Sequence, residues 1–392
     1  MVMIEPKPIL MVFVLEIKLT KYWKHIICIL PVFLFSFCST LKTNDLSLKM
    51  DFVFNDLIII PNVIINDHLQ GNFIFDTGSN HTVIDSRQIK QTLNNSKKGT
   101  IKDFYGNIDT INITEPCTLK LLNLTIKNVK LRNYNLHKVL KKYDAIGIIG
   151  TDIISRFSWK FDFVNKKLTL SSFPYKNDSL LFFNVDYKDK CKVKDAVWIN
   201  NIKIKPTIID SGSLSEIVSN NFDLVKNDHN YYVEKNLINS LTSKTPEVYE
   251  IGLTNHATLL NNNNIFTHNK LQLNKNYNNI IGLDFFHKDF LVFDGVSSKV
   301  YFNRYKIKDN INLNTIGLRF DFNSEGNIIV QAITKNGLAE KIGIRLGDEV
   351  LQVNDIKVTN SINKLENINK IRNQIETIIV KRKNEHLRFS LQ

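Results

Sequence analysis

Residues 63–76 read VIINDHLQGNFIFD, and residues 197–210 read VWINNIKIKPTIID. The two stretches align without a gap at an offset of 210 − 76 = 134 residues. Each consists of short apolar runs interrupted by Asn, Gly or Pro, and each ends in Asp. Such runs are typical of β-strands and tight turns. The alignment therefore indicates that one structural unit occurs twice in this chain.

A second pair of similar stretches follows in each half. Residues 148–168 match residues 280–300 at an offset of 282 − 150 = 132, which pairs Gly150 with Gly282. The two offsets differ by only two residues, so the order and spacing of the blocks are the same in both halves. We predict a mainly β fold in which two pseudo-symmetric lobes span residues 46–172 and 181–304.

A hydroxyl residue, a glycine and a serine follow the last Asp of each aligned stretch. The two turns read Asp76-Thr77-Gly78-Ser79 and Asp210-Ser211-Gly212-Ser213. Glycine allows a sharp turn whose N–H donates to the acid, while hydroxyl groups orient the carboxylate. Two such acids that face each other across a pseudo-twofold axis cannot both ionise readily and share one proton. The pair is suited to deprotonating a water molecule while protonating an amide oxygen.

These turns, together with the apolar-apolar-Gly strands that end at Gly150 and Gly282, resemble the pepsin/retropepsin superfamily with both lobes in one chain. The resemblance implies an aspartic endopeptidase that acts on a protein or peptide substrate without a cofactor or metal. It assigns catalysis to Asp76 and Asp210, and an active-site cleft between the lobes.

The same resemblance implies roles for the neighbouring residues. Thr77 and Ser211 would hydrogen-bond across the lobe interface, beside Gly78 and Gly212. Ser79 and Ser213 would hold the outer carboxylate oxygens, and Tyr105 with Gly106 would lie in a flap that closes over the substrate. The alternative from another class is a non-catalytic envelope protein that binds peptides in the same cleft.

The sequence changes in character after a charged hinge at residues 306–310. Residues 336–354 read NGLAEKIGIRLGDEVLQVN, which resembles the signature of PDZ domains attached to bacterial peptidases. The resemblance implies a PDZ-like domain over residues 311–392, with Ile316, Gly317 and Leu318 at the carboxylate-binding loop and a helix over residues 361–374. A peptide that adds as a strand is the implied ligand. Because the hinge separates two complete signatures, we expect this domain to dock substrates independently of catalysis.

The N-terminus has the features of an export segment, which we place at residues 1–45. Lys18, Lys21 and Lys24 precede an apolar run over residues 26–37, which is short for a membrane span. Cys38 follows the run and resembles the acylated cysteine of bacterial lipoproteins. A lipoprotein, a secreted protein and a protein that keeps its apolar anchor are the three alternatives, and each implies an exported protein, in the cell envelope or periplasm or outside the cell.

The amino-acid composition narrows the remaining classes of protein and of binding partner. Of the 392 residues 43% are hydrophobic and 23% are charged, as in globular proteins. The formal net charge of +13 is spread along the chain, so we expect no nucleic-acid partner. The four cysteines form no CxxC pair and no zinc-type cluster, and Cys117 with Cys191 could be a disulfide or two buried thiols. Nothing in the sequence indicates an oligomeric state.

Overall fold

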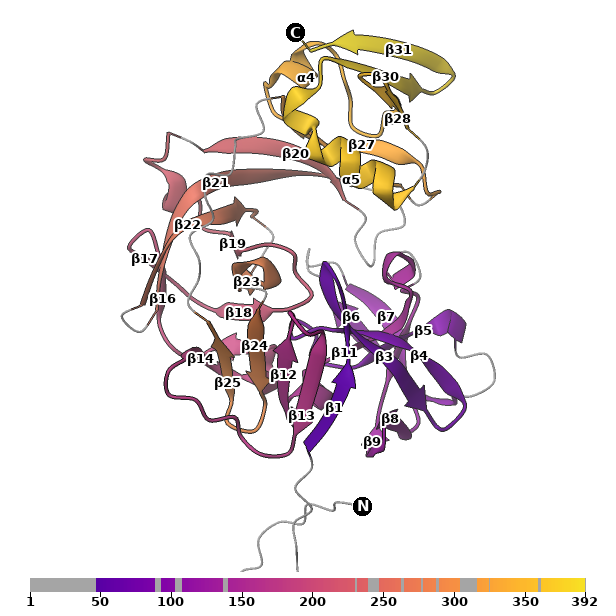
Figure 1. The fold of residues 1–392 in the computed structure, drawn as a ribbon, viewed down its shortest axis with the longest axis vertical. Helices are drawn as coiled ribbons and strands as arrows, with labels where there is room; N and C mark the ends of the chain where they lie inside the picture. Colours follow the sequence, from indigo (N-terminus) through magenta and orange to yellow (C-terminus); the bar gives the residue numbers. More distant parts are fainter. Residues whose placement is uncertain are drawn as a thin grey trace, which may run out of the picture. The chain divides into compact units, whose positions relative to one another are not determined.

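A computed structural model describes most of the chain after residue 46. The described residues are 47–88, 93–102, 108–136, 140–229, 231–238, 247–261, 264–275, 278–286, 289–303, 316–323, 325–358 and 361–391. They form a mainly β structure with a few short helices (Figure 1). The export segment with Cys38, the flap candidates Tyr105 and Gly106, and the hinge at 306–310 lie outside these residues. None of the described helices is long and apolar enough to cross a membrane.

Short strands make up the first repeat. They are β1 (Ser47–Asp51), β2 (Val53–Asn55), β3 (Leu57–Ile65), β4 (Leu69–Phe75), β5 (Val83–Asp85), β6 (Asn95–Lys102), β7 (Ile108–Thr114), β8 (Cys117–Leu121), β9 (Leu124–Val129), β10 (Arg132–Tyr134), β11 (Ala145–Ile149), β12 (Ser158–Asp162) and β13 (Lys167–Ser171), with the helix α3 (Thr151–Ile154) and the 3-10 turns η1 (Ser86–Gln88) and η2 (Lys141–Tyr143).

The second repeat has corresponding strands. They are β14 (Leu181–Asp186), β15 (Lys192–Val193), β16 (Val197–Ile199), β17 (Ile202–Ile204), β18 (Thr207–Asp210), β19 (Ile217–Ser219), β20 (Tyr232–Ile238), β21 (Glu247–Asn261), β22 (Asn264–Leu273), β23 (Asn279–Gly282), β24 (Phe290–Asp294) and β25 (Lys299–Phe302), with the 3-10 turns η3 (Tyr187–Asp189), η4 (Phe222–Val225) and η5 (Leu283–Phe285).

The two repeats share one strand arrangement around their Asp turns. In the first, β4 runs parallel to β11, β11 pairs antiparallel with β5, and β5 runs parallel to β10. In the second, β18, β23, β19 and β22 are joined in the same order and the same senses. The registers Ile74 with Ile148 and Ile208 with Ile280 are equivalent under the sequence offsets. The duplication read from the sequence is therefore also present in the strand topology.

One sheet joins the two repeats. Strands β12 and β24 pair antiparallel, with Lys160 opposite Val292, and these two positions are 292 − 160 = 132 residues apart. A pseudo-twofold axis therefore passes between them. Strands β13 and β1 continue the sheet on one side, and β25 and β14 continue it on the other. Phe75, Phe161 and Phe293 lie fully buried in the shared core beside this sheet, with Phe75 about 5 Å from each of the other two rings.

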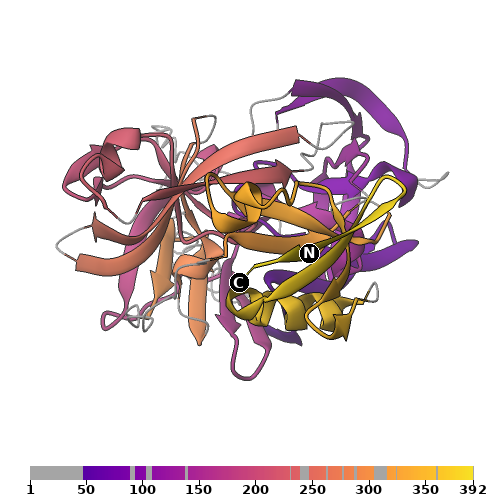
Figure 2. The same cartoon turned by 90° about the horizontal axis from the view of Figure 1, so that it is seen from above.

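The C-terminal segment, residues 316–391, has a separate apolar core. Its elements are β26 (Leu318–Phe322), β27 (Ile328–Thr334), α4 (Leu338–Lys341), β28 (Glu349–Val353), β29 (Ile356–Lys357), α5 (Ile362–Lys370), η6 (Arg372–Gln374), β30 (Thr377–Arg382) and β31 (Glu385–Ser390). The predicted helix over residues 361–374 is present as α5 and η6, and the Ser361 side chain caps its start. Figures 1 and 2 both show β27 running beside β20 of the second repeat, and the two strands are paired.

Cys117 and Cys191 are free thiols, and both are buried. The sequence left open a disulfide or two buried thiols, and the structure has two buried thiols. Burial raises the pKa of the Cys117 thiol to about 11, so this side chain is protonated at neutral pH and serves as an apolar core residue.

Candidate functional site

The two aspartates that end the aligned stretches meet at the junction of the repeats. Asp76 directly follows β4 and Asp210 is the last residue of β18, and a side-chain hydrogen bond joins their carboxyl groups. Each turn also supports its own acid, because Gly78 N–H donates to Asp76 Oδ1 over 2.8 Å and Gly212 N–H donates to Asp210 Oδ1 over 2.9 Å. Two residues far apart in sequence thus form one symmetric carboxyl pair.

The glycines of the two turns are required by close packing. A Cβ atom on Gly78 would lie 2.4 Å from Cγ of Asp210, and a Cβ atom on Gly212 would lie 2.7 Å from Cγ of Asp76. Each glycine therefore packs against the carboxyl group of the opposite repeat, and any side chain would push the two acids apart. This explains why both turns keep glycine at the same position.

Thr77 and Ser211 form the reciprocal hydrogen bonds expected between the turns. Ser211 Oγ accepts from Thr77 N–H over 3.0 Å and donates to the Phe75 carbonyl over 2.9 Å. Thr77 Oγ1 accepts from Ser211 N–H over 2.9 Å and donates to the Ile209 carbonyl over 2.8 Å. Both side chains are buried, so this network fixes the backbone before each acid across the repeat junction.

The serines that follow the glycines do not hold the carboxylates with their hydroxyl groups. Ser79 Oγ donates to the His81 carbonyl over 2.8 Å, and Ser213 Oγ shares a 2.7 Å hydrogen bond with Ser215 Oγ. The expected contact is replaced in part by the Ser79 backbone, whose hydrogen bond to Asp76 lowers the pKa of that carboxyl. Sequence could not distinguish these roles, because a hydroxyl next to a turn has several acceptors within reach.

Burial raises the pKa of both acids above that of an ordinary aspartic acid. The pKa of Asp210 lies well above its usual value, because burial acts first and the neighbouring Asp76 charge and hydrogen bond add to it. The charge of Lys190 lowers the pKa of both groups. Of the two protons that the pair can carry, one is therefore held strongly and the other leaves more easily. Loss of the second proton gives the singly protonated pair that water activation requires.

Lys190 was not identified from the sequence. Its backbone N–H donates to Oδ1 of Asn80, which follows the first Asp turn, over 3.0 Å, and it has a left-handed φ of 53°. These features depend on a contact between residues 110 positions apart, which has no local sequence signal.

Other titratable residues near the turns have structural partners. His81 Nε2 lies 3.1 Å from Arg132 Nη2, and its pKa is lowered by burial and by that guanidinium charge. Asp152 accepts from Thr82 Oγ1 over 2.7 Å, and Asp294 accepts from Tyr175 N–H over 2.9 Å. Within the described ranges, no group of three or more His, Cys, Asp or Glu is arranged to hold a metal ion.

Of the C-terminal residues assigned to a carboxylate-binding loop, Ile316 and Gly317 precede β26 and Leu318 is its first residue. Ile316 and Leu318 are buried, and Gly317 has a left-handed φ of 75°. The Gly317 carbonyl accepts from Thr334 N–H over 2.8 Å. The loop is thus tied to β27 on one side, and α5 lies against β26 through Asn369.

No family model matches this chain, and no curated protein matches its sequence.

Proposed function

We propose that this protein is an aspartic endopeptidase of two pseudo-symmetric lobes, residues 46–172 and 181–304, with a PDZ-like domain over residues 311–392. One observation carries the proposal. The half-buried Asp76 and the buried Asp210 form a hydrogen-bonded carboxyl pair at the junction of the repeats, and the glycine of each Asp turn packs against the carboxyl group of the other turn.

The mechanism follows from the shared proton. The ionised carboxyl group takes a proton from a water molecule, which attacks the carbonyl carbon of the scissile peptide bond, while the protonated carboxyl group donates to the carbonyl oxygen. The tetrahedral intermediate then collapses: the carboxyl group that took the proton of water gives it to the amide nitrogen, which leaves, and a hydroxyl of the intermediate returns its proton to the other carboxylate as the carbonyl re-forms. The substrate would be an extended protein segment, with apolar side chains preferred beside the scissile bond.

The proposal is tested by incubating the purified protein, residues 45–392, with a peptide library over a range of pH and identifying cleaved bonds by mass spectrometry. We expect internal peptide bonds to be cleaved, and the rate to be unchanged by a chelator, because two carboxyl groups activate the water directly. A protein that binds library peptides but leaves all of them intact would instead be the non-catalytic peptide-binding protein.

The C-terminal domain is proposed to bind a peptide as an added strand along β26. The side-chain amide of Asn369 contacts the backbone of β26 where such a strand would pair. Asn369 of α5 accepts from Phe320 N–H over 3.3 Å and donates to the Phe320 carbonyl over 3.2 Å. Its amide thus makes both hydrogen bonds that one residue of an added strand would make. A peptide must replace Asn369 to pair at this position.

Replacing Asn369 by Ala is therefore expected to strengthen peptide binding by about tenfold, because two hydrogen bonds no longer have to be broken. Binding of a random heptapeptide pool to an Asp76→Asn background, which prevents cleavage, measures the effect. Asn367→Ala on the exposed side of the same helix is the matched control. Equal binding by the Asn369 variant and the control would remove this groove as the docking site.

We also propose that the protein is exported, on the basis of the basic flank and short apolar run before Cys38. Cell fractionation is expected to find it outside the cytoplasm, and the intact mass then separates the three alternatives. Acyl chains on Cys38 identify a lipoprotein, whereas cytoplasmic protein that retains residues 1–37 would contradict export.

A further inference from the structure

The C-terminal segment extends the sheet of the second repeat. Strand β20 pairs with β21 along one edge and with β27 along the other, with Glu234 opposite Thr334 and Asn236 opposite Ala332. Just beyond the ladder, Lys335 N–H donates to the Val233 carbonyl over 2.8 Å. The β20–β21 hairpin is therefore held between its own repeat and the C-terminal segment by backbone hydrogen bonds.

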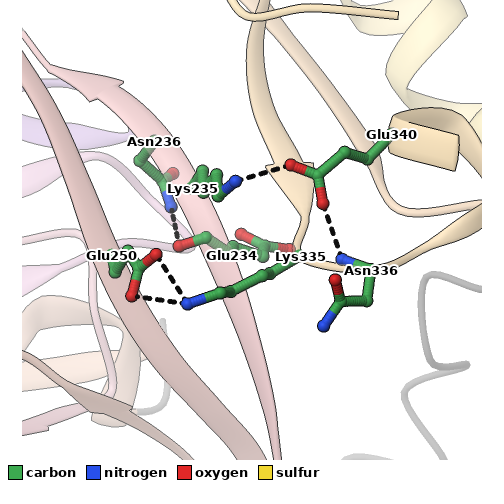
Figure 3. A network of polar contacts seen from close by, with 7 residues as sticks. All are labelled: Glu234, Lys235, Asn236, Glu250, Lys335, Asn336 and Glu340. Atoms are coloured by element: carbon green, nitrogen blue, oxygen red, sulfur yellow. Dashed lines mark hydrogen bonds and ion pairs between the residues drawn. The ribbon is translucent and has the colours of Figure 1, made fainter. Parts of the chain in front are cut away.

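Two ion pairs border this ladder, and Figure 3 shows both of them. Lys235 Nζ lies 2.6 Å from Glu340 Oε1 of α4, and Lys335 Nζ lies 2.9 Å from Glu250 Oε1 of β21. The second oxygen of Glu340 also accepts from Asn336 N–H over 2.7 Å, which fixes the carboxylate. Such partly exposed pairs contribute little stability, about 0–1 kcal/mol each, but both of them join the hairpin to the C-terminal segment.

A buried contact lies on the same ladder. Arg319 of β26 donates through Nη2 to Asn236 Oδ1 and through Nε to Gln331 Oε1, the latter over 3.1 Å. Gln331 in turn donates to the Leu237 carbonyl over 3.3 Å. Asn236 is only 1% exposed, so loss of Arg319 would leave a buried acceptor with one fewer donor.

Hydrogen bonds join the strands next to this hairpin to the residues that follow the second Asp turn. Glu216, which follows Ser215, is 4% exposed; its carbonyl accepts from Gly282 N–H over 2.9 Å and its carboxylate accepts from Lys270 N–H over 2.8 Å. The pKa of Lys270 is lowered, because burial and the charges of Arg319 and Arg372 outweigh the opposing charges of Glu234 and Glu216. Lys270 lies on β22, which pairs with β21, so its backbone hydrogen bond to Glu216 joins the sheet of the clamped hairpin to the residues that follow the second Asp turn.

The clamped hairpin is also the repeat counterpart of the candidate flap. Adding the offset of 134 to the hairpin of β6 and β7, residues 95–114, gives residues 229–248, which cover β20 and the start of β21. The flap candidates Tyr105 and Gly106 come between β6 and β7 in the sequence. Of the two corresponding hairpins, the second is paired with the C-terminal segment.

We propose that the C-terminal segment is a clamp that fixes the β20–β21 hairpin, with Arg319 as the positioning residue that couples this clamp to the second catalytic turn. The inference deepens the proposed peptidase and rests on it, and it replaces the expectation that the C-terminal domain acts independently of catalysis. The partner of the β20 edge is thus a strand of the same chain, and an edge that could pair with other chains is covered.

The test uses the mature chain and a short library peptide that the protease cleaves. Arg319→Met is expected to lower kcat by about tenfold, a coupling of the usual size, when it is assayed well below its unfolding midpoint, which the loss of a buried donor also lowers. Arg388→Met, at an exposed position of β31, is the matched control. Lys235→Glu should lower kcat as well, and the swap Lys235→Glu with Glu340→Lys should restore it to within about twofold.

Hydrogen exchange of the β20–β21 amides supplies a readout that does not need activity. We expect faster exchange there in Arg319→Met and Lys235→Glu than in wild type or Arg388→Met. Unchanged exchange overturns the clamp, and faster exchange with unchanged kcat overturns its coupling to catalysis. If the wild type cleaves no peptide, the proposed peptidase fails, and the exchange measurement alone decides whether the clamp exists.

Discussion

Asp76→Asn and Asp210→Asn are each expected to lower kcat by at least about a thousandfold, because general acid–base catalysis by the pair needs one ionised and one protonated carboxyl group. Asparagine keeps the shape of aspartic acid and the oxygen that accepts from Gly78 or Gly212, but it cannot take the proton of water. Initial rates on a library peptide measure the loss. Near wild-type turnover by either purified variant would contradict the assignment of both acids.

The same variants should not lose stability at neutral pH. A carboxyl group whose pKa is raised by folding costs stability as the pH rises above its unfolded value, about 3.9, because the folded state resists losing the proton. Burial raises the pKa of both acids, so the wild type is penalised at neutral pH and the neutral asparagine is not. Urea unfolding at pH 7 should find Asp210→Asn at least as stable as wild type, which separates loss of chemistry from loss of fold.

Ser211→Ala is expected to destabilise the protein by about 2–6 kcal/mol. The substitution removes the acceptor for Thr77 N–H and the donor to the Phe75 carbonyl, and both contacts are buried at the junction of the repeats. Each backbone group left without its partner costs about 1–3 kcal/mol. Equilibrium urea unfolding of the mature protein measures the change.

Two further variants make this result specific. Ser211→Thr keeps the hydroxyl group, as Thr77 does in the first repeat, and should recover most of the lost stability. Ser86→Ala, at an exposed position of η1, should change stability by less than about 0.5 kcal/mol. A loss for Ser211→Ala as small as that of Ser86→Ala would mean that the hydroxyl network does not hold the repeats together.

The duplicated Asp turns were predictable because their requirements are local. A strand that ends in Asp, a glycine that packs without a side chain, and a hydroxyl beside it are all visible as residue types at fixed spacing. The sequence offset then brought Asp76 and Asp210 together in the prediction, as the structure does, and it paired Gly150 with Gly282 at the start of the short helical turns α3 and η5. The helix over residues 361–374 was predicted from the resemblance to PDZ domains, and the structure has α5 and η6 there.

The parts that could not be predicted depend on distant contacts. Pairing of β20 with β27 uses backbone groups that every residue has, so neither strand carries a sign of its partner. The hydroxyl groups of Ser79 and Ser213 hydrogen-bond to nearby groups instead of the carboxylates. The amide of Asn369 contacts β26 at a position where a PDZ-type signature predicts a ligand. A charged hinge suggested an independent module, whereas edge pairing connects that segment to the second repeat.

Binding of a statine-type transition-state analogue such as pepstatin tests the carboxyl pair most directly, because its central hydroxyl group would occupy the position of the attacking water between the two acids. Isothermal titration of wild type, Asp76→Asn and Asp210→Asn measures it. We expect the wild type to bind, and each variant to bind at least about a hundredfold more weakly, as transition-state recognition requires. Equal affinity in all three proteins, or no binding by the wild type, would contradict a competent Asp76–Asp210 pair.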